Sequence, residues 1–188
     1  MSDPGTQQLS ADMHPPTLAL RPLSISDEGE VRLAQLELMT DGFNFLHGLG
    51  EEEPWPSYLD RLERIRTGAE VIEDWAPETF LVAEVAGQLV GRASVRHRLT
   101  PFLAQWGGHI GYAVRPAFRR RGYATEILRQ ALLVAREVGV QRVLVTCDDT
   151  NVGSARVIER CGGVLQNVVA AQHGTTPKRR YWFEHATG

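Results

Sequence analysis

A strand, an arginine-rich turn and an amphipathic helix follow one another between residues 109 and 139, and this succession constrains the fold most. Apolar residues alternate over His109–Val114, which predicts a strand, and Pro116 ends it. A helix is predicted next, because apolar residues recur at helical spacing up to Gly139. Those residues are Ile127, Leu128, Ala131, Leu132, Ala135 and Val138.

Three arginines, Arg119, Arg120 and Arg121, stand immediately before Gly122, where this helix is expected to start. The free N–H groups of a helix N-terminus already carry positive potential, so each cation there costs about 0.3–1 kcal/mol. A bound phosphate would reverse the sign of that interaction, and the small Gly122 and Ala124 would let its oxygens approach the main chain. The alternative is a solvated basic loop paired with acids. The adjoining strand and helix favour the phosphate interpretation.

The segment resembles the GNAT superfamily of N-acetyltransferases, in which the motif Arg/Gln-x-x-Gly-x-Gly/Ala follows a strand. Here the motif reads Arg119-x-x-Gly122-x-Ala124. The resemblance implies that main-chain amides of this loop bind the pyrophosphate of acetyl-CoA, and that the strand end near Val114 pairs with its pantetheine arm. The implied contacts in the loop are Arg119, Arg120, Arg121, Gly122, Tyr123 and Ala124.

The resemblance continues through a second apolar strand, Arg142–Cys147, and a short helix after it. An Asn-x-x-Ala/Ser stretch lines the cofactor in the family. It is matched here by Asn151 and Ser154, which are therefore implied cofactor contacts. The match covers roughly residues 79–185, and the chain looks most like uncharacterised bacterial predicted acetyltransferases.

The order of predicted elements indicates an α/β (α+β) protein. Residues 1–16 are polar and proline-containing and are expected to be a disordered tail, whereas residues 17–188 are expected to form a single domain. Two helices should follow a first strand near Leu18–Leu23, and a hairpin with its turn at Ala86-Gly87 should begin the main sheet. The resemblance implies the GNAT-like acyl-CoA acyltransferase fold, with a mixed, mostly antiparallel central sheet flanked by helices.

Composition argues against two classes of function. The chain has 188 residues and a net charge of −3, whereas nucleic-acid-binding domains are usually basic throughout. No stretch approaches the roughly 18 apolar residues that span a bilayer, and the N-terminus lacks a signal core. We therefore expect a cytoplasmic protein without nucleic-acid or membrane partners. The resemblance is compatible with a homodimer.

Cysteine usage predicts neither a metal site nor a redox centre. Cys147 and Cys161 stand in apolar surroundings and lack metal-ligand spacing to each other or to histidines. We expect both to be core thiols, with a redox or catalytic role as the alternative. No metal is expected, and acetyl-CoA is the expected cosubstrate.

Acetyl transfer to an amine needs a group that takes up a proton, and His109 is the candidate base. Many family members place a glutamate near the start of the strand before the phosphate loop, and His109 stands near there in this chain. Its ordinary pKa of about 6.5 suits proton transfer near neutral pH. The alternative is a hydrogen-bonded structural histidine at the entry to the strand.

The acid that the family often uses to protonate the departing thiolate is missing. It is a tyrosine seven residues after the asparagine matched by Asn151, and that position holds Ile158, which cannot donate a proton. Tyr181 is our candidate acid, with Tyr112, Tyr123 or water as alternatives. The replacement also leaves open a second class of function, a non-catalytic acyl-CoA binding or sensing domain.

Aromatic and acidic residues gather between residues 43 and 75 and are candidates for the acceptor site. Glu51–Glu53 suggest a cationic acceptor, with Trp55 as an apolar wall, and a solvated acidic loop is the alternative. The leading prediction is an acetyl-CoA dependent N-acetyltransferase that modifies a primary amine of a small molecule or peptide. The gathered residues are Phe43, Phe45, His47, Glu51, Glu52, Glu53, Trp55 and Trp75.

Overall fold

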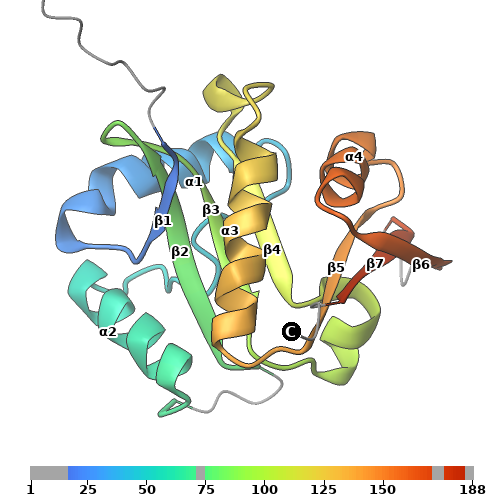
Figure 1. Ribbon diagram of the computed structural model, residues 1–188. Helices are drawn as coiled ribbons and strands as arrows, with labels where there is room; N and C mark the ends of the chain where they lie inside the picture. Colours follow the sequence, from blue (N-terminus) through green and yellow to red (C-terminus); the bar gives the residue numbers. More distant parts are fainter. Residues whose placement is uncertain (1–16, 71–74, 171–175, 185–188) are drawn as a thin grey trace, which may run out of the picture.

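A single sheet of seven strands runs through the described part of the chain (Figure 1). The computed structural model describes residues 17–70, 75–170 and 176–184. The strand order is β1-β2-β3-β4-β5-β7-β6, with β4 and β5 parallel and the other neighbours antiparallel. The predicted mixed, mostly antiparallel sheet is confirmed. The strands are β1 (Ala19–Arg21), β2 (Glu78–Val85), β3 (Gln88–Arg96), β4 (Ile110–Val114), β5 (Arg142–Asp148), β6 (Val164–Val169) and β7 (Lys178–Glu184).

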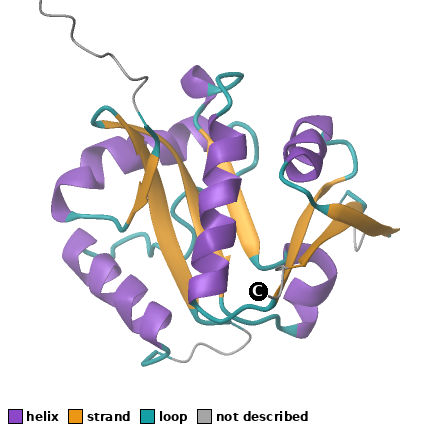
Figure 2. Cartoon of the chain, in the orientation of Figure 1, coloured by secondary structure: helices purple, strands orange, loops and turns teal. Residues whose placement is uncertain are grey.

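Helices cover both faces of the sheet (Figure 2). α3 and α4 pack on one face, and α1 and α2 pack on the other. A turn of π-helix at Leu103–Gly107 precedes β4, and no sequence pattern indicated it. No helix in the described ranges is long and apolar enough to cross a bilayer. The helices are α1 (Glu28–Met39), α2 (Trp55–Thr67), α3 (Tyr123–Glu137) and α4 (Val152–Arg160).

Side-chain alternation along β3 separates two cores. Ala93 and Val95 belong to the core under α3 and α4, because successive side chains of a strand point to opposite faces. Arg92 points to the other face, where its guanidinium lies over the ring of Phe80 at 5.2 Å from the centroid. The core on that face consists of side chains from α1, α2, β2 and the segment between the helices.

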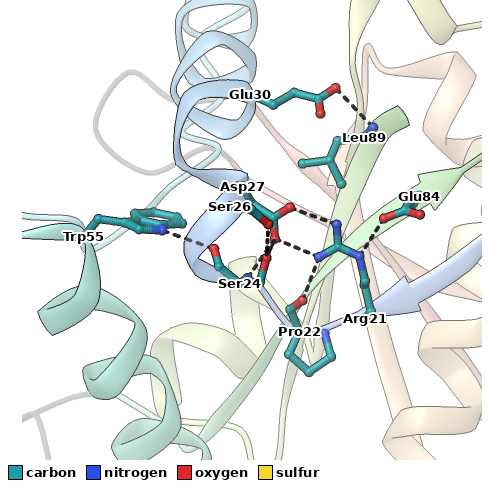
Figure 3. Close-up of polar contacts among 9 residues, drawn as sticks. All are labelled: Arg21, Pro22, Ser24, Ser26, Asp27, Glu30, Trp55, Glu84 and Leu89. Atoms are coloured by element: carbon teal, nitrogen blue, oxygen red, sulfur yellow. Dashed lines mark hydrogen bonds and ion pairs between the residues drawn. The ribbon is translucent and has the colours of Figure 1, made fainter. Parts of the chain in front are cut away.

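A partly buried ion-pair network ties β1 to the start of α1 and to β2 (Figure 3). The guanidinium of Arg21 donates to both carboxylate oxygens of Asp27, at 2.7 and 2.8 Å, and to Glu84 of β2 at 2.7 Å. Asp27 also accepts hydrogen bonds from the main-chain N–H and hydroxyl of Ser24. The indole N–H of Trp55 donates to the Ser24 carbonyl at 3.2 Å, which joins α2 to the same network.

Two turns that were predicted from the sequence are confirmed. Ala86 and Gly87 join β2 to β3 with φ values of 50° and 79°, in the left-handed region that tight hairpin turns require. Gly139 follows α3 with φ of 88°, as expected for a residue that ends a helix. Both turns depend on local conformational preference, which explains why the sequence sufficed to find them.

The parallel strands β4 and β5 meet over a short distance and then separate. Ile110 opposite Val145 is the one register pair between them in the described residues. In Figure 1 the two strands come together at the lower end of β4 and diverge toward the ends where α3 and α4 begin. Main-chain groups of β4 beyond Ile110 therefore face a region where β5 does not pair with them.

Candidate functional site

The loop that joins β4 to α3 presents a run of main-chain N–H groups without acceptors. Thr125 and Glu126 donate to the carbonyl of Gly122, but the N–H groups of residues 120–124 find no main-chain acceptor within the described chain. No side chain caps this end of α3. Such an exposed row of N–H groups at a helix N-terminus is a site for phosphate oxygens.

The backbone conformation of the loop explains why residue 122 is a glycine. Gly122 has φ of 85° and Arg120 has φ of 65°, so two residues of this loop adopt the left-handed conformation found in main-chain nests that bind anions. A Cβ at Gly122 would meet no heavy atom within 4 Å, which means that its surroundings are open to a ligand. Arg119 and Arg121 contact nearby carbonyls, those of Val114 and Ala117, at 3.1 and 3.0 Å.

Arg115 fixes this loop to α1, and sequence reasoning missed it. It is only 6% exposed, and its guanidinium donates to both carboxylate oxygens of Glu37 at 2.8 Å. It also donates to Glu30 at 2.9 Å and to the Leu89 carbonyl at 2.8 Å. The hydrogen bonds from Arg115 lower the pKa of Glu37 although burial opposes the shift. A single arginine after a strand, next to a proline, gave no signal of its own.

Asn151 and Ser154 stand at the start of α4, on the other side of the diverging strands. The Asn151 side chain accepts a hydrogen bond from the Ser154 N–H at 2.9 Å and so caps the helix. The Ser154 hydroxyl shares a hydrogen bond of 2.9 Å with the hydroxyl of Tyr112. This contact bridges β4 and α4 across the gap between β4 and β5.

Tyr112 therefore combines a ring that packs on the core with a hydroxyl that has a specific partner. Its ring packs against the core under α3, while its hydroxyl reaches Ser154 and the side chain remains partly exposed. Burial raises the pKa of Tyr112 well above its ordinary value, so the hydroxyl keeps its proton at neutral pH. Cys147, close by on β5, is buried, and burial raises the pKa of its thiol as well.

His109 holds β4 and β5 together at the point where they meet. It is 6% exposed, and its Nδ1 accepts a hydrogen bond from the main-chain N–H of Leu144 at 2.9 Å. The main-chain N–H of His109 donates to the Leu144 carbonyl at 2.7 Å. Burial, and then the charge of Arg96, lower the pKa of His109 to about 4. A nitrogen that already accepts a main-chain proton is not free for an amine, so these contacts favour the structural alternative over the base.

We expect His109→Asn to separate these roles, because the Asn side-chain oxygen can accept from Leu144 but cannot act as an imidazole base. Turnover at pH 8 should be retained within about threefold, whereas loss of a catalytic base typically costs 10²–10⁴-fold.

In the wild type the unfolded state binds more protons than the folded state between pH 6.5 and about 4. Stability should therefore fall by up to about 3 kcal/mol as the pH decreases through this window.

The asparagine variant should lose that part of the pH dependence. Chemical denaturation of both proteins at several pH values between 4 and 8, with acetylation assays at pH 8, measures both effects. A large drop in kcat with an unchanged pH profile of stability would instead restore His109 as the base.

Tyr181, the candidate acid, lies in β7, opposite Val145 of β5. It is 0% exposed in β7, and its hydroxyl donates to Glu159 of α4 at 3.0 Å. Burial raises its pKa, while the hydrogen bond with Arg179 opposes the shift. The structure places this hydroxyl under α4 rather than beside Tyr112, and its contacts give the acid assignment no support.

The residues proposed to form the acceptor site separate into core and surface. Phe45 and Trp55 are buried in the core under α1 and α2. Glu53 pairs with Arg61 at 2.7 and 2.8 Å, so it is not a free acid, whereas Glu51 and Glu52 are exposed. A cationic acceptor held by all three acids has no support from these contacts.

His47 is the member of this group that joins a buried polar cluster on the sheet. Its Nε2 lies 3.1 Å from Glu78, and its ring packs near Trp75 and Phe80. Sequence spacing gave no indication of the partner, which comes from β2. Among the described residues, no group of three or more histidines, cysteines or acids is arranged to hold a metal ion.

Comparison with known proteins agrees with this geometry. A family model described as Acetyltransferase (GNAT) family matches residues 44–163, which include the phosphate loop and the Asn151–Ser154 turn. The chain belongs to the acetyltransferase (GNAT) family. None of the curated proteins matches the chain in sequence.

Several solved GNAT-like structures share the fold at low identity. The microcin C7 self-immunity acetyltransferase MccE, solved with acetyl-CoA and AMP, is 17% identical with a TM-score of 0.62, over 89% of this chain and 92% of that one. A putative acetyltransferase from Salmonella typhimurium with its cofactor acetyl-CoA is 15% identical with a TM-score of 0.61, over 90% and 96%. An acetyltransferase from Salmonella typhimurium that modifies the N-terminal serine of ribosomal protein L7/L12 is 17% identical with a TM-score of 0.65, over 90% and 95%.

Proposed function

We propose that this GNAT family member is an N-acetyltransferase that transfers the acetyl group of acetyl-CoA to a primary amine of a small molecule or peptide. The observation that carries the proposal is the row of unpaired N–H groups at the start of α3, next to strands that diverge. Acetyl-CoA supplies the acetyl thioester when bound. A cytoplasmic location and a homodimer stay predictions.

The phosphate loop and the strand end account for cofactor binding. The N–H groups from Arg120 to Ala124 donate to pyrophosphate oxygens, and Arg119 and Arg121 add positive charge beside them. Main-chain groups of β4 after Ile110 are available to the pantetheine amides, because β5 does not pair with them, although the Val114 carbonyl also accepts a hydrogen bond from Arg119. Asn151 and Ser154 border the same gap from the α4 side.

The Tyr112 hydroxyl is the proton donor that replaces the missing family tyrosine. As the amine nitrogen forms its bond to the acetyl carbon, the carbon–sulfur bond breaks and the sulfur leaves with the electron pair. Tyr112 holds a proton at its Oη, oriented by Ser154 at 2.9 Å, and can give it to this sulfur. The amine loses its own proton to water, and solvent returns a proton to Tyr112.

The proposal is tested by a broad panel of amines and amino-terminal peptides incubated with acetyl-CoA, with free CoA and acetylated products measured by mass spectrometry. Turnover of at least one amine is expected. The alternative, a non-catalytic acyl-CoA sensing domain, rests on Ile158 at the usual acid position. Tight acetyl-CoA binding without turnover of any amine would favour the sensor.

We expect Tyr112→Phe to lower kcat by about 10²-fold with a KM for acetyl-CoA within about threefold of wild type, because only the acid is removed. Steady-state kinetics with the best amine measure both constants. Ser154→Ala is the matched variant, since it keeps the phenol but removes its partner, and it should cost less. An unchanged kcat in Tyr112→Phe would assign thiolate protonation to water.

A further inference from the structure

A polar cluster lies on the face of the sheet opposite α3, where an apolar core would be expected. In register across β2, β3 and β4, Phe80 stands opposite Ser94 and Ser94 opposite Gly111. On the same face of β3, Arg92 and Arg96 flank Ser94. The β4 positions on this face carry either no side chain or a methyl group, so β4 leaves space beside these polar groups.

Arg92 is a buried cation that makes no ion pair with an acid among the described residues. It is 4% exposed, and its guanidinium lies over the rings of Phe43 and Phe80, at 4.7 and 5.2 Å from their centroids. One terminal nitrogen donates to the Asn44 carbonyl at 3.0 Å, whereas Nε and the other terminal nitrogen have no hydrogen-bond partner in the described chain. Buried cations are usually paired, because an unpaired one loses its hydration without compensation.

Ser94 is a second buried polar group without a partner. It is 0% exposed, and its hydroxyl makes no hydrogen bond within the described chain. A Cβ placed on Gly111 would lie 3.3 Å from this hydroxyl and 3.7 Å from each terminal nitrogen of Arg96. The hydroxyl and the edge of the Arg96 guanidinium therefore converge on one point directly above Gly111.

The charges around this point do not cancel. Glu78 lies 3.2 Å from Nε of Arg96 and 3.1 Å from His47, and these neighbours with Arg92 lower its pKa although burial opposes the shift. One carboxylate thus faces the two guanidinium groups of Arg92 and Arg96. Even with His47 neutral, the cluster carries one positive charge in excess.

The point above Gly111 is close to the proposed chemistry, and its surroundings are only partly exposed, since the Ser94 hydroxyl itself is buried. Gly111 is partly exposed and precedes Tyr112, whose side chain lies on the other face of β4. The Arg96 side chain is 19% exposed. Gly111 and Arg96, which are partly exposed, are therefore the groups of this cluster that a bound molecule would reach first.

From this arrangement we infer that the acceptor amine carries a carboxylate, and that Ser94 and Arg96 bind that carboxylate above Gly111, while Arg92 adds positive charge on the same face of β3. The inference rests on the proposed acetyltransferase function and narrows its acceptor to amino-acid-like molecules. Two terminal nitrogens of Arg96 at equal distance from one point suit the two oxygens of a planar carboxylate. Gly111 has no Cβ, which at this position would crowd the Ser94 hydroxyl at 3.3 Å.

A binding experiment tests the site without relying on turnover. The N-acetyl derivatives of the standard amino acids are each compared with their uncharged amides, at equal ionic strength, by the midpoint of thermal unfolding. At least one acid should raise the midpoint by about 2 °C or more above its amide, because ligands that bind the folded state stabilise it. If no acid exceeds its amide, the inference is wrong.

Two small substitutions then locate the binding. Ser94→Ala removes a buried hydroxyl that has no partner, so a purely structural role predicts unchanged or higher stability without ligand. Gly111→Ala places a methyl group at the convergence point. Both variants should fold and should lose the carboxylate-dependent shift, whereas Gly29→Ala, at an exposed helical glycine with open surroundings, should keep it.

Kinetics distinguish failure of this inference from failure of the proposed function. For an amino acid that is acetylated, Ser94→Ala should raise its KM about tenfold or more and leave acetyl-CoA binding unchanged. Equal activity on amino acids and their amides would overturn the carboxylate site while keeping the acetyltransferase. Carboxylate-dependent stabilisation without turnover of any amine would support the carboxylate site and contradict the proposed acetyltransferase activity.

Discussion

Gly122→Glu is expected to reduce acetyl-CoA affinity by at least about 100-fold. The new side chain would place a carboxylate beside the N–H groups of residues 120–124 and repel the phosphates that they are proposed to bind. It would also strain the backbone, because Gly122 has φ of 85°, where a residue with a Cβ costs about 1–2 kcal/mol. Calorimetric titration of acetyl-CoA into both proteins measures the change.

Gly139→Glu is the matched control for backbone strain. Gly139 lies at the other end of α3 with φ of 88°, and a Cβ there also meets no atom within 4 Å. The control should lose similar or slightly more stability, since an acid at a helix C-terminus is unfavourable, and should retain wild-type affinity. Equal acetyl-CoA affinity of Gly122→Glu and wild type would show that the loop at Gly122 does not bind the phosphates. If acetyl-CoA does not bind to the folded wild type, both the enzyme and the sensor proposals are wrong.

Arg115→Met is expected to lower the free energy of unfolding by about 1–3 kcal/mol, because it leaves two partly exposed acids of α1 without the buried guanidinium that they contact. Arg115 is 6% exposed and joins the start of the phosphate loop to Glu30 and Glu37. Urea denaturation at pH 7 measures the loss. Weaker acetyl-CoA binding is expected as well, since the loop loses its attachment to α1.

Arg119→Met is the control for the stability part of this prediction. Arg119 pairs with Asp41 at the surface, with side chains 43% and 46% exposed, so its removal should cost less than about 1 kcal/mol. The pH provides a second check. The pKa of Glu37 is lowered from 4.5 by Arg115, so the stability from this pair is present above that pH and is lost as the pH falls. A constant difference between Arg115→Met and wild type down to pH 3 would contradict the ion-pair explanation.

Local features of this protein were predictable from neighbouring residues alone. The hairpin at Ala86-Gly87, the end of α3 at Gly139 and the turn before α3 at Gly122 each depend on backbone preferences within a few residues. The mixed sheet followed from the order of these elements and from the family resemblance. The π-helix before β4 escaped prediction because its sequence carries no periodic pattern.

The chemical roles of side chains were less accessible, because they depend on partners that are distant in sequence. His109 stands where a base was expected, yet its Nδ1 meets the main chain of Leu144, 35 residues further on. Arg115 gave no signal until its contact with Glu37, 78 residues away, was known. Tyr112 was one of several equal alternatives until its hydroxyl was found beside Ser154.

Local sequence information was enough to predict a glycine-containing turn between a strand and a helix, and the family to which the chain belongs. That information is local, since main-chain N–H groups form the turn and glycine permits its conformation. Which side chains are buried, paired or left without a partner depends on the tertiary structure. Register across β2, β3 and β4 brought Ser94, Arg96 and Gly111 together, and burial in that arrangement determines what each group can bind.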